Sequence, residues 1–176
     1  MLRLLTFAVT ILMLSCTPTS SSSPKKSDKK MIKIPQYEPK IALPWHEVFK
    51  NLIAKEENPV QAWALFSVGG WADDGQRFII QTPAGYKVYV GKPGLRAANA
   101  DQLAMKVASR FDFRPEAFTT LSTVEESIFD SLNYEYLHLD FQKKAGSAKQ
   151  VYLRVGNFDK YPAHSKLIQS FKSAVK

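Results

Sequence analysis

Apolar residues recur along residues 41–176 with two different periods, and the change of period separates predicted helices from predicted strands. Three segments carry an apolar residue at every third or fourth position, which is the spacing of one helix face. They predict helices at 44–55, 99–113 and 162–175. Pro44 and Pro162 stand at the start of two of them, where a missing backbone N–H costs nothing.

The middle helix is predicted from spacing and from a cap. Asn99 is a favourable residue before a helix, and Gln102 three positions later completes a capping-box pattern. Three apolar residues then recur at every fourth position: Leu103, Val107 and Phe111.

Five other segments are rich in branched and aromatic residues, which favours strands. They are residues 61–68, 77–81, 86–90, 133–141 and 150–155. Short connections between neighbouring strands favour antiparallel pairing. The expected fold class is therefore α+β: an antiparallel sheet of about five strands with about three helices packed on one face, preceded by a disordered tether.

The N-terminus carries an apolar run at residues 4–14, which is long enough for a signal-peptide core but about half of what a membrane-spanning helix needs. Ser15 and Cys16 follow it directly. A small residue before a cysteine at this place resembles the lipobox of bacterial lipoproteins. In that family the cysteine is acylated and the chain is cut before it. An ordinary secretory peptide with an incidental cysteine is the alternative.

The lipobox resemblance implies that residues 1–15 are a signal peptide and that acylated Cys16 anchors the chain in a lipid bilayer of the cell envelope. Several acyl chains anchor a protein stably. Thr17 resembles the default signal for delivery to the outer membrane, facing the periplasm, if the cell has two membranes.

Residues 16–40 are rich in Ser, Pro and Lys and predict a flexible tether, because they offer little apolar surface to bury. Its lysines would either lie on anionic lipid or keep the spacer solvated, and both interpretations stay open. The chain has 24 basic and 16 acidic residues, of which 17 and 14 belong to the single domain predicted at 41–176. This even balance argues against a nucleic-acid partner. The single cysteine excludes an intramolecular disulfide.

Several features between residues 67 and 175 resemble emfourin-type domains, which are small inhibitors of thermolysin-like metalloproteases. They are the strand end Ser67-Val68-Gly69-Gly70-Trp71 with Val68 inserted, a helix and Phe-rich stretch at 99–113, the element Asp130-Ser131-Leu132-Asn133-Tyr134, and a last helix at 163–175. The resemblance implies the same fold and protease inhibition, with no individual inhibitory residue transferred.

A loop rich in glycine and aspartate is the candidate partner-binding site, because loops on a rigid scaffold often carry function. Its residues are Gly69, Gly70, Trp71, Asp73, Asp74 and Arg77. Adjacent glycines would allow Trp71 to point into solvent, where tryptophan is a typical hot-spot residue. The alternative is that Trp71 folds back as a lid on the sheet.

Candidate catalytic groups are scattered, and we predict no enzyme, metal or cofactor. His138 and Asp140 share a strand face and could pair, but no nucleophile motif accompanies them. His46, on a polar helix face, and His164 lie on predicted helices without a partner at ligand spacing. Glu125 and Glu126 are expected to be surface charges, and Asp73-Asp74-Gly75 is expected to be a turn.

Two function hypotheses follow. The first is a membrane-anchored envelope lipoprotein that acts as a protein-binding module on an unidentified envelope or secreted protein, with protease inhibition as the implied activity. The second is a structural envelope lipoprotein whose sheet edge joins a larger assembly.

Overall fold

The structure is a computed structural model of the 176-residue chain. It describes residues 32–40, 42–69, 75–92, 99–118, 120–121, 123, 133–143, 146–154 and 161–175. Within these residues no helix is both long and apolar enough to cross a membrane.

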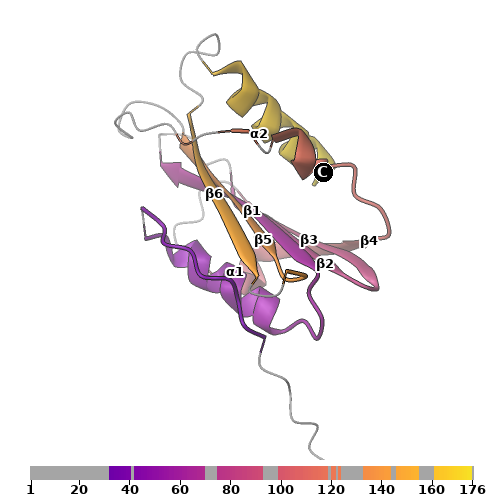
Figure 1. The fold of residues 1–176 in the computed structure, drawn as a ribbon. Helices are drawn as coiled ribbons and strands as arrows, with labels where there is room; N and C mark the ends of the chain where they lie inside the picture. Colours follow the sequence, from indigo (N-terminus) through magenta and orange to yellow (C-terminus); the bar gives the residue numbers. More distant parts are fainter. Residues whose placement is uncertain are drawn as a thin grey trace, which may run out of the picture.

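The described residues form an α+β fold around one sheet of six strands, each antiparallel to its neighbours (Figure 1). The strands are β1 (Gln61–Gly69), β2 (Arg77–Thr82), β3 (Gly85–Gly91), β4 (Leu103–Ala108), β5 (Asn133–Asp140) and β6 (Ser147–Arg154). Their order across the sheet is β4-β3-β2-β1-β5-β6, so β4 and β6 are the edges. The α+β class and the antiparallel sheet are confirmed, with one strand more than expected.

The two α-helices lie on opposite faces of the sheet, and the expectation that all helices pack on one face is wrong. In Figure 1, α1 (Pro44–Ala54) lies below the sheet and α2 (Pro162–Ala174) lies above it. The cause is visible in β1, which is buried on both sides. Ala64 and Phe66 face the α1 side, while Leu65 belongs to the cluster on the α2 side. A strand without a polar face needs a cover on each side of the sheet.

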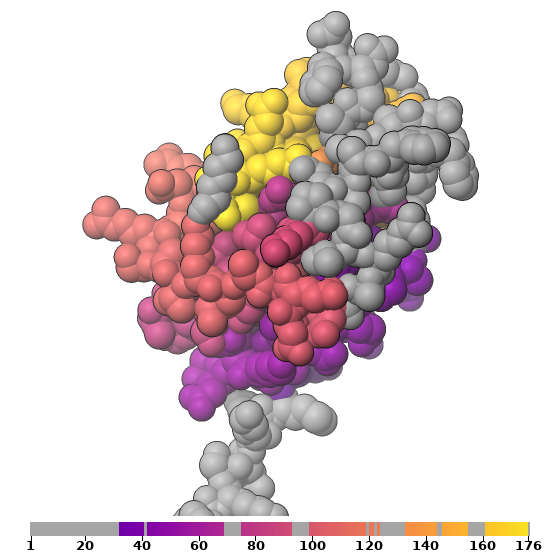
Figure 2. All heavy atoms as spheres, turned by 180° about the vertical axis from the view of Figure 1, so that it is seen from behind, coloured from indigo at the N-terminus to yellow at the C-terminus, as the bar shows by residue number. Residues whose placement is uncertain are grey.

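The prediction of a helix at 99–113 is wrong. This stretch forms a 3₁₀ turn (Ala100–Gln102) and then the edge strand β4. Asn99 does act as a cap: its side-chain oxygen accepts a hydrogen bond from the backbone N–H of Asp101 at 3.0 Å. The cap therefore starts a turn that leads into a strand paired with β3. Seen from behind, the stretch from 99 to 118 forms a broad part of the surface (Figure 2).

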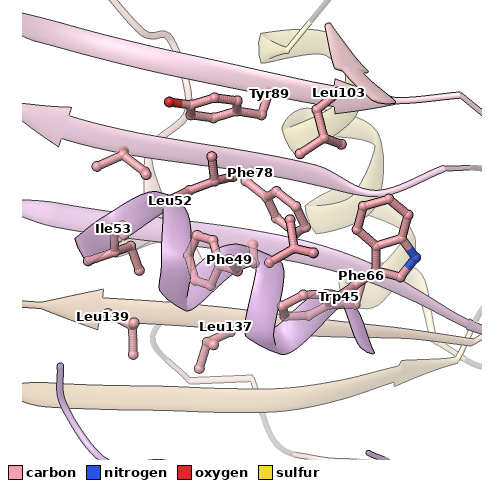
Figure 3. Packing of buried hydrophobic residues seen from close by; sticks show 14 residues of the cluster. Trp45, Phe49, Leu52, Ile53, Phe66, Phe78, Tyr89, Leu103, Leu137 and Leu139 are labelled. Carbon is pink, nitrogen blue, oxygen red and sulfur yellow. The ribbon is translucent and has the colours of Figure 1, made fainter. Parts of the chain in front are cut away.

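The core under α1 is mainly aromatic and aliphatic (Figure 3). Phe49 of α1 packs against Phe66 of β1 and Phe78 of β2, with ring centroids 6.0 and 5.1 Å apart. Below its C-terminal end, Glu56 is buried and accepts two hydrogen bonds from the Lys87 ammonium of β3, at 2.8 and 2.7 Å. Helix α1 is thus fixed over the central strands.

The core under α2 is built from the alternate residues of the same strands. It joins Leu167, Ile168 and Phe171 of the helix to a cluster from the sheet and from the segment that follows β4. Phe113 is central, with ring centroids 5.0 Å from Phe171 and 5.8 Å from Phe118. This segment returns from the sheet edge to close the second layer.

Residues 32–40 lie against the domain, which differs from the expectation that the whole of 16–40 is an independent tether. We call this segment the strap. Pro35 is buried, and Ile34 and Tyr37 pack against the cluster on the α1 side. The strap, in indigo in Figure 1, lies on the same side of the sheet as α1. The rest of the predicted tether and the signal peptide, including Cys16, lie outside the described residues.

Candidate functional site

The predicted binding loop connects the end of β1 to the start of β2, at one end of the central strand pair. Gly69 is the last residue of β1 and Arg77 is the first residue of β2. The other predicted loop residues lie outside the described part of the chain: Gly70, Trp71, Asp73 and Asp74. The structure therefore describes the base of the loop and leaves the exposure of Trp71 a prediction.

A buried glutamine closes the base of this loop. The side-chain amide of Gln76 accepts a hydrogen bond from the Ser67 backbone N–H at 3.0 Å and donates one to the Ser67 carbonyl at 3.3 Å. It continues the pairing of β1 with β2 after the backbone register ends at Leu65 and Arg77. Because Gln76 is 3% exposed, these bonds are shielded from water and hold the two loop ends at a fixed separation.

Local backbone geometry also restricts the loop base. Gly75 has a φ of +79°, and a Cβ there would lie 2.3 Å from the Gly91 carbonyl oxygen, so a larger residue does not fit. The Arg77 guanidinium donates a hydrogen bond to the Gly75 carbonyl at 3.1 Å. On β1, the register with β5 shifts between Ser67 and Gly69, which makes Val68 the extra residue of a β-bulge. The bulge occupies the position at which Val68 interrupts the predicted motif.

A second polar cluster, which the sequence did not reveal, lies under the strap. Glu135 of β5 is completely buried on the α1 side, and His46 of α1 is 3% exposed. The His46 Nε2 and Glu135 Oε2 atoms are 3.1 Å apart, at ion-pair distance. The Gln150 side chain of β6 donates a hydrogen bond to the other carboxylate oxygen at 2.6 Å. A buried carboxylate thus has partners on two different elements.

The strap is connected to this cluster at two points. The Tyr37 hydroxyl lies 3.4 Å from His46 Nδ1. The Lys40 backbone N–H donates a hydrogen bond to the Tyr152 hydroxyl at 2.5 Å, and Gln150 donates to the same hydroxyl at 3.2 Å. A continuous set of polar contacts therefore links strap, α1, β5 and β6. We call it the strap cluster.

Burial sets the protonation of the strap tyrosine. It raises the pKa of Tyr37 well above its ordinary value, and the charges of Glu135 and Glu47 raise it further. Tyr37 therefore keeps its proton, which it can donate to His46 Nδ1. A hydroxyl, an imidazole and a carboxylate in this order are also the parts of a nucleophile relay. Three cavities among the described residues, of about 380–510 Å³, are lined by side chains other than those of the strap cluster.

The other histidines that the sequence singled out have separate partners. His138 and Asp140 share the α2 face of β5, as expected, but His138 stacks on Trp63 with ring centroids 5.3 Å apart. Burial lowers the pKa of His138. Asp140 accepts a hydrogen bond from the Gln142 backbone N–H at 2.9 Å. His164 lies on a helix, as expected, and is buried at the start of α2.

Glu125 and Glu126 lie outside the described residues, and so do the two aspartates of the predicted turn before Gly75. Across the described ranges, no three His, Cys, Asp or Glu side chains gather as a metal site would require.

His46 was expected on an outer helix face, and its burial is a second correction. The sequence does contain one indication that its partner, Glu135, is buried. In residues 133–141, Glu135 has the same alternation as Leu137 and Leu139, which face the α1 core. A charged residue at an apolar position of a strand indicates a buried partner.

Comparison with known proteins adds no relative: no family model matches the chain, and neither the curated proteins nor the solved structures contain a significant match.

Proposed function

We propose that this protein is a lipid-anchored lipoprotein of the cell envelope whose domain binds another protein through the loop between β1 and β2. The anchor is Cys16, whose sulfur is acylated before residues 1–15 are removed and whose new amine is acylated afterwards. The partner is an envelope or secreted protein. Secreted metalloproteases are the first class to test, because emfourin-type domains inhibit thermolysin-like members.

The observation that supports this proposal is the placement of the two ends of the sheet. Ile32 lines a cavity with Pro59, Pro83 and Phe141, where β1 begins and β2 turns into β3. The loop base at Gly69 lies at the other end of β1. Nine residues of strand separate the two ends by roughly 25–30 Å. A chain anchored upstream of the strap would hold the loop on the far side of the domain from its point of entry.

The anchor is tested by Cys16→Ser. We expect the variant to lose membrane retention and to accumulate as uncleaved precursor, measured by cell fractionation and by intact mass. A mature wild-type mass without acyl groups would remove the lipoprotein from the proposal and leave a secreted protein.

The loop is tested by Trp71→Ala in the otherwise intact protein. If Trp71 contacts the partner, the melting temperature stays nearly unchanged and affinity falls by about 2 kcal/mol or more. If Trp71 is a lid, the domain loses about 3–5 kcal/mol of stability. Residual activity of a panel of secreted metalloproteases, measured with wild type and variant, tests inhibition separately from binding.

The alternative is a structural lipoprotein that joins a larger assembly through its sheet edge. It is favoured by β4, an edge strand whose Met105 and Val107 side chains are 54% and 66% exposed. Loss of an envelope complex on substitution at these positions, with no effect of Trp71→Ala, would support the alternative over the loop.

A further inference from the structure

Strand β4 presents one long side without a strand partner among the described residues. Its pairing with β3 runs over six residues, from Gly91 with Leu103 to Tyr86 with Ala108. In an antiparallel strand, alternate backbone N–H and C=O groups point to either side, so half of those of β4 point outward. Such an edge is a template for another strand.

The exposed side chains of β4 form an apolar row on its α1 face. Met105 and Val107 follow the buried Leu103 with the period of a strand, and both are more than half exposed. In Figure 2 the stretch that contains β4 lies at the surface. A second strand placed beside β4 would cover this row.

We propose that β4 pairs antiparallel with β4 of a second copy of this chain, with Met105 opposite Met105 across a two-fold axis. This contact goes beyond the binding loop and needs neither the loop nor the anchor. It would extend the six-stranded sheet of each copy across the axis into one continuous sheet. A two-fold axis requires the strand to be complementary to itself. The axis could pass through Ala104, Met105 or Lys106, and each position gives a different register.

Side-chain pairing selects the register centred on Met105. It places Leu103 opposite Val107 twice, so that the whole apolar row is covered by its own copy. Lys106, the one charged residue of β4, falls opposite Ala104. A centre at Lys106 would set two lysines face to face, and a centre at Ala104 would place Val107 opposite Asp101.

The charges that flank β4 favour the antiparallel direction. Asp101 precedes the strand and Arg110 follows it, and both are exposed. Antiparallel pairing brings the acidic end of one copy next to the basic end of the other, at both ends of the contact. Beyond Arg110 the chain leaves the edge, because Phe111 packs toward Trp63 and Tyr86 on the α2 face.

The register is tested by disulfide trapping in the full-length chain with Cys16→Ser, so that the added cysteine is the only thiol. Directly opposite residues have Cα atoms about 4.5–5.5 Å apart, within disulfide range. Met105→Cys should therefore form a covalent dimer under mild oxidation. Lys106→Cys is the matched control, since its copy lies on a diagonal more than about 7 Å away. Equal cross-linking of both variants would overturn the register.

The contact itself is tested by sedimentation equilibrium of the same Cys16→Ser chain in mild detergent. We expect a monomer–dimer equilibrium in which Val107→Lys raises the dimer Kd about tenfold or more, since it puts a charge into the apolar row. Ala54→Lys, an exposed position on α1, adds the same charge and should leave Kd unchanged.

Exchanging the charges of Asp101 and Arg110 tests whether a weakened dimer can be restored. Asp101→Arg should weaken the dimer about fivefold, and Asp101→Arg combined with Arg110→Asp should restore it, because the exchange reverses both ends together. A monomer at every soluble concentration overturns the proposal and leaves β4 to a different partner. A dimer unaffected by Val107→Lys also overturns it, because the contact would then lie elsewhere.

Discussion

The two flanks of the α1 face end the same sheet in opposite ways. On the β6 flank, the strap covers the strands and is held by the strap cluster, in which Glu135 is fully buried. On the β4 flank, the strand is the edge and Val107 is 66% exposed. Helix α1 covers only the central strands, so each flank needs its own solution. The chain closes one flank with its own segment and leaves the other as a surface.

The difference shows what a buried polar cluster contributes here. An apolar strap would cover β6 equally well, and replacing buried ion pairs by apolar residues is often neutral or stabilising. Polar partners at defined distances instead restrict the strap to one path, from Pro35 near Gly146 to Lys40 near Tyr152. The direction in which the chain enters the domain is thereby defined.

Of the changes that test this difference between the flanks, removing the Glu135 carboxylate should have the largest effect on stability. Glu135→Ala leaves the buried His46 without its carboxylate partner and removes one of the two acceptors of the Gln150 amide. We expect a loss of about 3–5 kcal/mol in the free energy of unfolding. Urea denaturation followed by tryptophan fluorescence measures it. Glu135→Gln keeps the shape and one acceptor and should cost less. A loss below about 1 kcal/mol for Glu135→Ala would mean that the cluster does not hold the β6 flank.

Two glycines allow each flank to be loosened separately. A Cβ on Gly146 would lie 2.8 Å from Pro35 Cγ of the strap, and a Cβ on Gly85 would lie 2.9 Å from the Ala108 carbonyl of β4. Both glycines have positive φ, so either alanine variant should lose about 1–3 kcal/mol of stability. Amide hydrogen exchange should then rise in the strap for Gly146→Ala and in β4 for Gly85→Ala. The opposite distribution would contradict the assignment of the flanks.

The strap should also respond to alkaline pH through Tyr37. Its pKa in the folded state is raised above the ordinary value of 10.0, first by burial and then by Glu135 and Glu47. Above about pH 10 the unfolded chain loses a proton that the folded chain keeps, so this contribution is complete below that pH and is lost as the pH rises.

Tyr37→Phe isolates this effect. It should cost about 1 kcal/mol at neutral pH, the value of one neutral hydrogen bond, and should flatten the decline in unfolding free energy between neutral pH and about pH 11. Tyr89 and Tyr136, whose pKa values are also raised by burial, set the decline that remains. An unchanged slope would show that Tyr37 is accessible to solvent in the folded state.

The sequence predicted the elements whose period is unambiguous. Helix α1 shows apolar residues at both three and four positions apart, and only a helix face satisfies both spacings. The stretch after Asn99 offered Leu103, Val107 and Phe111, separated by four each time. Four is close to a helical turn, but it is also an even number, and residues an even number apart share one face of a strand. Pairing with β3, which is a tertiary contact, decided the outcome.

The site was predictable to a smaller extent. The loop between β1 and β2 was located correctly in the chain because glycine and aspartate mark breaks in strands. Gln76, which closes its base, carries no local signal, since its partner Ser67 is reached only when the strands pair. His46 and Glu135 are 89 positions apart in the chain and meet only through the packing of α1 on β5. Such contacts follow from topology rather than from spacing.

The smallest expected effect is that of a substitution at the exposed valine of β4, which we compare with the same substitution at a buried valine of β6. Val151 of β6 is 2% exposed and Val107 of β4 is 66% exposed. Threonine has nearly the same shape, so the substitution chiefly adds a hydroxyl. In Val151→Thr that hydroxyl is buried, which should cost about 1–3 kcal/mol of unfolding free energy. In Val107→Thr it meets water, and we expect a change within about 0.5 kcal/mol in dilute protein, where β4 has no partner strand. Val151 belongs to the α2-side cluster, so it serves as the reference for a covered edge strand. A loss similar to that of Val151→Thr would mean that Val107 is covered within a single chain and that the β4 flank is not an open surface.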